Sequence, residues 1–208
     1  SSKGGAIMLQ SASVLEVRYT NMSHNKAMGI YDKDGGGAYY IEGGSRLNMW
    51  HGSVSDSHSR VGGGFYLHGV DTSANITSTD MSNNEADLLG GGIYVGDRSD
   101  VVLSHCHIYD SQAINGSGVY GESSGDIHIW DSRLYENTAT TSGGAVYIGL
   151  DATLDSRRSN ISDNAATEGA GVYMSGGSGT LLETVLDFNR ASSKGGAIML
   201  QSASVLEV

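Results

Sequence analysis

The 208-residue chain has no proline and a single cysteine, Cys106. One cysteine cannot form an internal disulfide, so no disulfide framework is expected. Basic residues are also scarce, because twelve lysines and arginines stand against twenty-three acidic residues, for a net charge of −11. Nucleic acids and anionic membranes are bound by basic surfaces, which excludes both as expected partners. No run of 18 apolar residues occurs, so we expect no membrane insertion of this segment.

Glycine is abundant, with 31 residues, but a Gly-X-Y period is missing, which excludes collagen. Glycine-rich turns followed by apolar residues recur at intervals of 26 to 32 residues, and seven such intervals span 191 residues. They begin at residues 4, 36, 62, 90, 116, 143, 169 and 195. An internal repeat of this length indicates a solenoid in which each repeat forms one structural unit.

A second, longer period is visible at the two ends of the sequence. Residues 1–17 and 192–208 both read SSKGGAIMLQSASVLEV. We interpret 1–208 as a single continuous segment, with 1–191 as one long repeat and 192–208 as the start of an identical one. An engineered or circularly permuted chain would show the same duplication.

The local pattern predicts strands and turns. No segment has a helical period, and short alternating runs are bounded by Gly, Asn and Ser. Three short runs fit into each repeat, which is typical of one coil of a parallel β-helix. The fold class is therefore expected to be all-β, a parallel β-helix of about seven coils, with equivalent residues stacked roughly 4.8 Å apart.

Stacking predicts which side chains face inward. One inward column is Met22, Val54, Met81, Ile108, Leu134, Ile161 and Leu186; a narrow corner column is Thr20, Gly52, Thr79, Cys106, Ser132, Ser159 and Thr184. Two more are Val17, Met49, Ile76, Leu103, Ile129 and Leu181, interrupted by Ser156, and Ile7, Tyr39, Phe65, Ile93, Val119, Val146, Val172 and Ile198. Cys106 is accordingly expected to be a small buried thiol rather than a nucleophile.

A turn column predicts a structural Asn ladder. Its members are Asn25, Asn84, Asn137, Asn164 and Asn189, with Ser57 and Ser111 in the gaps. Asn adopts the left-handed conformation of tight turns readily, and its amide can bond to the equivalent amide in the next coil.

These marks resemble a known family. GGAI, GGGIY and GGAVY, each preceded by an apolar-x-x-Asn mark, are similar to the repeats of chlamydial polymorphic outer-membrane proteins. That family has Phe at the first position of the mark, where this chain has Met, Val, Ile or Leu. The resemblance covers essentially the whole chain and implies a right-handed parallel β-helix, with a pectin-lyase-like architecture, in a surface or secreted protein.

A tyrosine column follows the glycine turns. It comprises Tyr40, Tyr66, Tyr94, Tyr120, Tyr147 and Tyr173, continued by Met8 and Met199. Because it alternates with an inward column, we expect it to face outward as a flat stripe of rings. Such a stripe would be a lateral or ligand-binding surface, although stacked rings can also serve only to stiffen the sheet.

Candidates for chemistry are few. Asp32 and Asp34 precede Gly35 in the one clear insertion, 27–34, where a solvated acidic turn is a better interpretation than a calcium loop. His105 and His107 flank Cys106, and their columns continue as Asp131, Arg158 and Glu183, and as Asp80, Arg133 and Asn160, which favours a ladder of mixed charge over a metal pair. We expect no catalytic residues, no metal, no cofactor and no enzyme activity, a polysaccharide lyase or hydrolase being the least favoured function.

Four Asn-x-Ser/Thr sequons are candidates for N-glycosylation: Asn21, Asn75, Asn115 and Asn160. Asn21, Asn75 and Asn160 alternate with inward residues, so we expect their side chains to face outward and to be accessible. The expected protein is an extracellular or cell-surface structural fibre that associates with itself end to end and possibly side by side, such as a flagellar hair or surface appendage. The alternative is an adhesin that binds glycan or a host protein along the tyrosine stripe. Organism, ligand and repeat number stay open.

Overall fold

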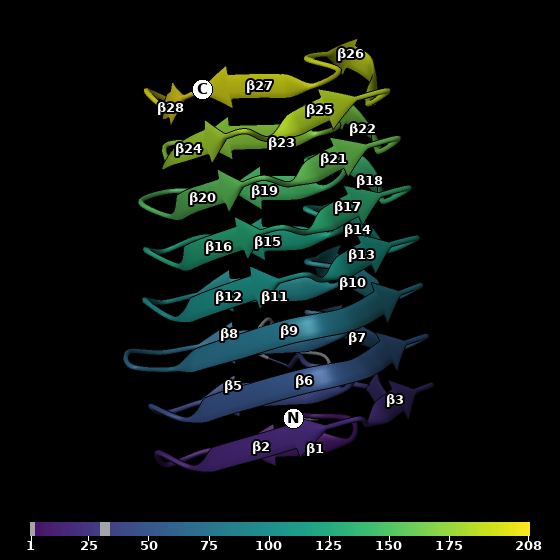
Figure 1. Ribbon diagram of the computed structural model, residues 1–208, viewed down its shortest axis with the longest axis vertical. Helices are drawn as coiled ribbons and strands as arrows, with labels where there is room; N and C mark the ends of the chain where they lie inside the picture. Colours follow the sequence, from purple (N-terminus) through teal and green to yellow (C-terminus); the bar gives the residue numbers. More distant parts are fainter. Residues whose placement is uncertain (1–2, 30–33) are drawn as a thin grey trace.

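The computed structural model describes residues 3–29 and 34–208, which form strands joined by turns (Figure 1). All strand pairs are parallel, and each strand pairs with its equivalents one repeat earlier and one repeat later in the chain, except that the strands at the ends of the sheets pair on one side only. This arrangement is a parallel β-helix, as the sequence predicts, and the all-β fold class is confirmed. Within the described part of the chain there is no helix able to cross a membrane.

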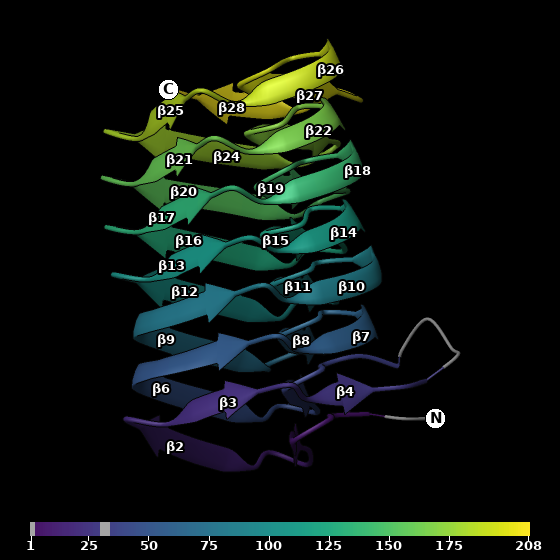
Figure 2. The same ribbon diagram turned by 90° about the vertical axis from the view of Figure 1, so that its right-hand side faces the viewer.

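Three sheets run the length of the molecule and are numbered here in the order in which a coil visits them. Sheet I has eight strands: β1 (Ile7–Leu9), β5 (Tyr39–Glu42), β8 (Phe65–His68), β11 (Ile93–Gly96), β15 (Val119–Gly121), β19 (Val146–Ile148), β23 (Val172–Ser175) and β27 (Ile198–Gln201). Sheet III has seven: β4 (Lys26–Ala27), β7 (His58–Val61), β10 (Glu85–Leu89), β14 (Gln112–Asn115), β18 (Thr138–Ser142), β22 (Ala165–Glu168) and β26 (Arg190–Lys194). Sheet III is stacked along one side in Figure 2.

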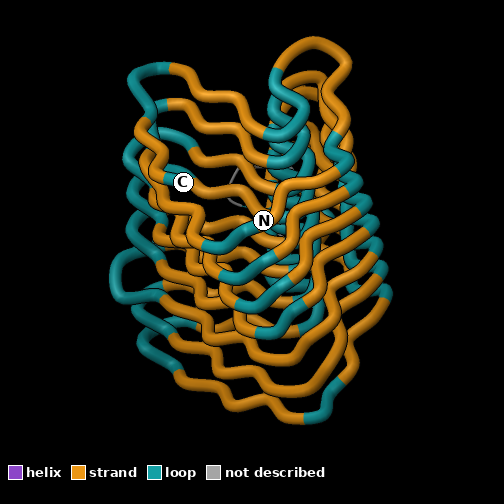
Figure 3. The backbone as a smooth tube through the Cα atoms, turned by 45° about the horizontal axis from the view of Figure 1, so that its top comes forward, coloured by secondary structure: helices purple, strands orange, loops and turns teal. Residues whose placement is uncertain are grey.

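Sheet II lies between them in each coil and has thirteen strands. They are β2 (Val14–Arg18), β3 (Asn21–Ser23), β6 (Arg46–Ser55), β9 (Ser73–Ser82), β12 (Asp100–Ser104), β13 (His107–Tyr109), β16 (Asp126–Trp130), β17 (Arg133–Tyr135), β20 (Thr153–Arg157), β21 (Asn160–Ser162), β24 (Ser178–Leu182), β25 (Val185–Asp187) and β28 (Val205–Glu207). In most coils this sheet bends at one residue, which divides it into two strands, whereas β6 and β9 continue through the bend. Figure 3 shows the strands and turns stacked into columns.

The bends depend on single residues in the left-handed conformation. In sheet II the bend residue has a positive φ in every coil, for example 55° at His105 and 51° at Asp131. At the turn into sheet III the left-handed residue is the one before the ladder Asn, as at Asn83 (φ 52°) and Asp163 (φ 57°). The expectation that the ladder Asn itself takes this conformation is therefore wrong. The side-chain amide of the ladder Asn can therefore hydrogen-bond to the equivalent residue of the next coil, along the axis of the β-helix.

The four inward columns form one continuous core. Most of their side chains are completely buried, and Cys106 is among them. Ser156 keeps the register, since it pairs with Ile129 on one side and Leu181 on the other. Its hydroxyl lies 3.1 Å from that of Thr184, which gives this polar side chain a partner in the core. The expected interruption at Ser156 is thus a change of side chain and not of register.

The Asn ladder is confirmed in the late coils, which contain Asn137, Asn164 and Asn189. Asn137 donates from its side chain to Oδ1 of Asn164 at 3.0 Å, and Asn164 donates to Oδ1 of Asn189 at 2.9 Å. The same amides also donate to backbone carbonyls of Ile108 and Leu134. Because these turns are buried, the amides satisfy backbone groups that water cannot reach.

Candidate functional site

The tyrosine column of sheet I is one stack of rings. Its members pair in register from strand to strand, and neighbouring ring centroids lie 4.7 to 5.7 Å apart with small interplanar angles. The rings point away from the main core, as the alternation of side chains in a strand requires. The stacking that the sequence predicts is confirmed.

The expected exposure of this column is wrong. Tyr40 and Tyr66 are 1 % and 2 % exposed, Tyr94 and Tyr120 are 7 % exposed, and Tyr173 is 8 % exposed. Four of these rings form a second apolar cluster with Val61, to which partly buried leucines and Tyr147 are added. The rings of the column cover one another's faces, so only their edges reach the surface.

The cause is the tight glycine turn between sheet III and sheet I. Its glycine is left-handed in every coil, and at Gly116 a Cβ atom would lie 2.8 Å from Cβ of Tyr120. The turn therefore folds the end of each sheet III strand against the outer face of sheet I. The alternation of the sequence indicates which way Tyr120 points, but it cannot indicate that the chain folds back over it.

Two glutamates bind the tyrosine hydroxyls. Glu42 accepts a hydrogen bond from Tyr40 at 2.7 Å, and Glu122 accepts one from Tyr94 at 2.7 Å and one from Tyr120 at 2.9 Å. Burial, followed by the charge of Glu122 and its hydrogen bonds, raises the pKa of Tyr94 and Tyr120 well above the ordinary value of 10.0. These hydroxyls stay protonated and act as donors.

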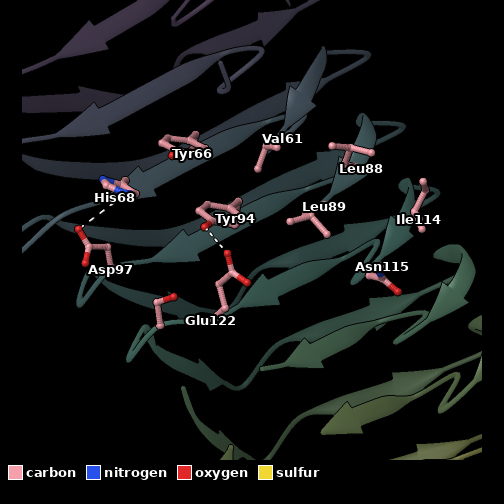
Figure 4. A pocket seen from close by; sticks show the side chains of 11 residues that line it. Val61, Tyr66, His68, Leu88, Leu89, Tyr94, Asp97, Ile114, Asn115 and Glu122 are labelled. Carbon is pink, nitrogen blue, oxygen red and sulfur yellow. Dashed lines mark hydrogen bonds and ion pairs between the residues drawn. The ribbon is translucent and has the colours of Figure 1, made fainter. Parts of the chain in front are cut away.

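A groove opens beside the column, with a cavity of about 610 Å³. One wall is apolar and comes from sheet III, with Leu88, Leu89 and Ile114. The other wall is polar and follows the ends of β11 and β15, with Asp97 and Glu122. The edges of Tyr66 and Tyr94 lie between the walls (Figure 4). The groove is therefore amphipathic across its width.

Sequence reasoning missed Glu42, Glu122 and the leucines of the groove. A signal existed, because both glutamates stand two residues after a column tyrosine and so occupy the same place in their coils. The leucines are harder to find, since Leu88 and Leu89 belong to β10, whose register with its neighbours is irregular.

The other candidate residues are spread over different faces. His105 lies exposed at a bend and His107 on β13, where its Nδ1 is 3.1 Å from Oδ1 of Asp80. Arg158 binds Asp131 through two contacts of 2.8 and 2.9 Å, and these bonds lower the pKa of that carboxyl. The mixed-charge ladder is confirmed at these two pairs.

No group of three or more possible metal-binding side chains occurs in the described part of the chain. Cys106 donates weakly to backbone oxygens, and burial raises the pKa of its thiol to about 11. Asp34 is 1 % exposed, so the expected solvated acidic turn is wrong at this residue. Asp32 lies outside the described residues.

The sequons differ in surroundings. Asn21 and Asn75 are exposed on sheet II, while Asn160, on the same sheet, and Asn115 are partly buried. Asn75 donates to the side chain of Asn48 at 3.0 Å, and Asn115 lines the groove. The expectation of accessible side chains is met in full at two of the three outward sequons, and Asn160 is less open.

The family model described as "Right handed beta helix region" matches residues 1–191. The chain belongs to the right-handed β-helix family. No curated protein and no solved structure gives a significant match. Membership of the β-helix family agrees with the stacked coils, and it supplies the hand of the helix that the sequence resemblance implied. It assigns no substrate or partner.

Proposed function

We propose that this β-helix protein is a non-enzymatic, extracellular structural repeat protein that forms a surface fibre or filament by continuing its coils from one 191-residue period to the next. A flagellar hair or another cell-surface appendage is the kind of assembly meant. The resemblance to the repeats of polymorphic outer-membrane proteins supports a position at the cell surface.

One observation carries this proposal: the same 17-residue sequence pairs on both of its edges. The first copy pairs with the following coil, with Ile7 opposite Tyr39 and Val17 opposite Met49. The second copy, residues 192–208, pairs with the preceding coil, with Ile198 opposite Val172 and Val205 opposite Ser178. A single copy can therefore stand between the two kinds of coil and join two periods without a break.

Charges agree with this junction. Nζ of Lys3 binds the carboxylate of Glu42 in the following coil at 3.2 Å. Lys194, its equivalent in the second copy, lies 3.9 Å from Glu168 in the preceding coil. At a continuous junction one lysine would face a glutamate on each side, which is favourable for a chain of net charge −11.

The test is a tandem chain of two copies of 1–191 followed by 192–208. We expect one rigid rod that is longer than the 208-residue chain by about 34 Å, seven coils at roughly 4.8 Å each, as measured by small-angle scattering or electron microscopy. Lys194→Glu in the tandem should loosen the junction, and Lys26→Glu is the matched control. Two rods joined by a flexible connection would contradict the proposal.

A second candidate function, ligand binding beside the tyrosine column, is favoured by the groove. We propose it as a property of a surface protein, with host protein preferred to glycan, since stacking covers the ring faces on which a sugar would lie. We propose no catalysis, because Glu122 is bound to two tyrosines and Asp97 lies 3.6 Å from His68.

We predict that Asn21, Asn75 and Asn160 are glycosylated, and glycan at these residues would support secretion. Protein secreted from a eukaryotic host should carry glycan first at Asn21 and Asn75, as peptide mass spectrometry would show. Unmodified sequons in secreted material would contradict it.

A further inference from the structure

Glu42 and Glu122 occupy equivalent positions in different coils but have different surroundings. Each stands two residues after a column tyrosine and accepts a hydrogen bond from that tyrosine, Tyr40 or Tyr120. The chain supplies a cation to Glu42, since Lys3 binds its carboxylate at 3.2 Å and lies 4.9 Å from the centroid of the Tyr40 ring. This occupied site shows what a carboxylate in this place accepts.

Glu122 has no such cation. The strand pairing places Leu89 one coil before Asn115, as Lys3 stands one coil before Gly35, so Leu89 takes the place of Lys3 at this level. No ion pair to Glu122 is found among residues 3–29 and 34–208, although the carboxylate accepts two tyrosine hydroxyls. A partly buried carboxylate with one-sided hydrogen bonding favours a positively charged partner.

The neighbours of Glu122 within its column differ from those of Glu42. Its equivalents in the coils before and after are Gly96 and Gly149, which have no side chains, whereas Gln10 and His68 flank Glu42. Gln10 donates to Glu42 at 2.7 Å, and both residues line a separate cavity of about 580 Å³. At Gly96 the ring of Tyr94 takes this place, since a Cβ atom there would lie 2.6 Å from the tyrosine hydroxyl, and Glu122 itself lines the cavity.

We propose that this groove binds a basic peptide segment of a partner protein, with a lysine or arginine head at Glu122 and an aliphatic side chain next to it on Leu88, Leu89 and Ile114. The peptide's cation takes the place that Lys3 has at Glu42. Asp97, on the same wall, places a second carboxylate beside the binding position, 3.6 Å from Nε2 of His68. The apolar wall selects for an aliphatic neighbour, which separates this groove from a merely acidic surface.

This inference specifies the ligand of the second candidate function and is independent of the fibre, because it can be tested on the single 208-residue chain. The probe is the peptide acetyl-Gly-Leu-Lys-Leu-Gly-amide, titrated while methyl NMR signals of Leu88, Leu89 and Ile114 are followed. We expect saturable chemical-shift changes at these methyls, and a peptide affinity that falls as the salt concentration is raised.

Glu122→Gln should weaken peptide binding about tenfold, because a charged hydrogen bond is lost. Asp163→Asn is the matched control, since it removes the same charge at an exposed turn where Asn83 stands in an earlier coil, and it should leave the affinity within about twofold. Leu89→Lys should also weaken binding, because the new lysine supplies from within the chain the cation that Glu122 lacks.

Three outcomes would overturn the proposal. One is equal binding of a peptide in which acetyl-lysine replaces lysine, and another is an equal loss in Glu122→Gln and Asp163→Asn, which would mean unspecific attraction to an acidic chain. The third is that cellohexaose shifts the same methyls and the peptide does not, which would make the groove a glycan site. None of these results bears on whether tandem periods join into a rod, so the two proposals fail separately.

Discussion

The early and late coils of this β-helix fill the same cross-section with different side chains. In the early coils, the inward column of sheet I holds Tyr39 and Phe65, whose rings are parallel and 4.9 Å apart. In the late coils the same column holds Val119, Val146 and Val172. The backbone register continues through both regions without a change.

The turn column makes more side-chain hydrogen bonds in the late coils than in the early coils. In the early coils Ser57 interrupts the ladder, and its hydroxyl donates to its own coil, to the backbone oxygen of Ser55 at 3.1 Å. Asn84 consequently has two side-chain bonds, one from the backbone of Ser57 and one to the backbone of Val54. Asn164, in the late coils, takes part in five.

The comparison teaches that a coil can be held by apolar volume or by buried amides. A larger inward side chain adds transfer free energy, about 25 cal/mol for each Å² buried, while an amide ladder satisfies backbone groups that the turn leaves unpaired. The two regions therefore predict different responses to the same kind of substitution.

The largest effect is expected in the inward column of sheet I, at the stacked rings of Tyr39 and Phe65. Phe65→Ala removes a completely buried side chain and the partner of Tyr39, which should lower the free energy of unfolding by about 3–5 kcal/mol. Val146→Ala, in the same column of the late coils, is the control and should cost about 2 kcal/mol. Urea unfolding followed by circular dichroism measures both. Equal losses would show that the two regions do not differ in this column.

Next in size is the loss of a ladder amide. Asn164→Ala leaves several buried donors and acceptors unpaired and should cost about 2–4 kcal/mol, more than Asn84→Ala at about 1–3 kcal/mol. Amide hydrogen exchange of the flanking turns should locate the loss in the late coils for the first variant and in the early coils for the second. A larger effect for Asn84→Ala would reverse the comparison.

The repeat explains why so much of the fold can be read from the sequence. Equivalent residues are stacked by backbone pairing, so one register fixes every column, and Ser156 can replace an apolar residue without shifting it. The Asn ladder follows from the same counting. In this turn column the residue that bends was assigned wrongly, because both Asp163 and Asn164 are residue types that occur in tight turns.

The site is less predictable, because it depends on how sheets approach each other. Alternation shows that Tyr94 points away from the main core, but the fold-back of sheet III over it is a property of the turn angle. Glu122 becomes a groove residue because Tyr94 of the preceding coil and Leu89 of the coil before that lie beside it. Such coincidences between three coils are not visible in the pattern of one repeat.

A smaller, stabilising effect is expected when the early ladder is completed. Ser111→Asn places an amide between Asn84 and Asn137, in a turn whose preceding residue, Asp110, already has the φ of 53° found at the other ladder turns. The new amide should raise the free energy of unfolding by about 0.5–1.5 kcal/mol. Thermal unfolding measures the gain, and Ser111→Ala is the control that removes the hydroxyl without adding an amide. A loss of stability in Ser111→Asn would mean that the early turn is too narrow for the side chain.

The smallest effect concerns pH and again separates the two regions. Burial acts to raise the pKa of Glu42, but the hydrogen bonds from Tyr40, Lys3 and Gln10 outweigh it and hold the pKa below the ordinary value of 4.5. A carboxyl whose pKa is lowered by folding adds stability that is complete above 4.5 and is lost as the pH falls through its folded value. The Asn ladder of the late coils carries no charge and adds no such dependence.

Glu42→Gln should therefore lower the stability of the early coils by less than about 1 kcal/mol at neutral pH and by almost nothing near pH 3. Hydrogen exchange of β5 and β8, compared with β19 and β23 as internal controls, measures this difference at both pH values. If the variant and the parent chain differ by the same amount at both, the carboxylate of Glu42 does not contribute through its charge, and the Lys3 contact is no guide to what binds at Glu122.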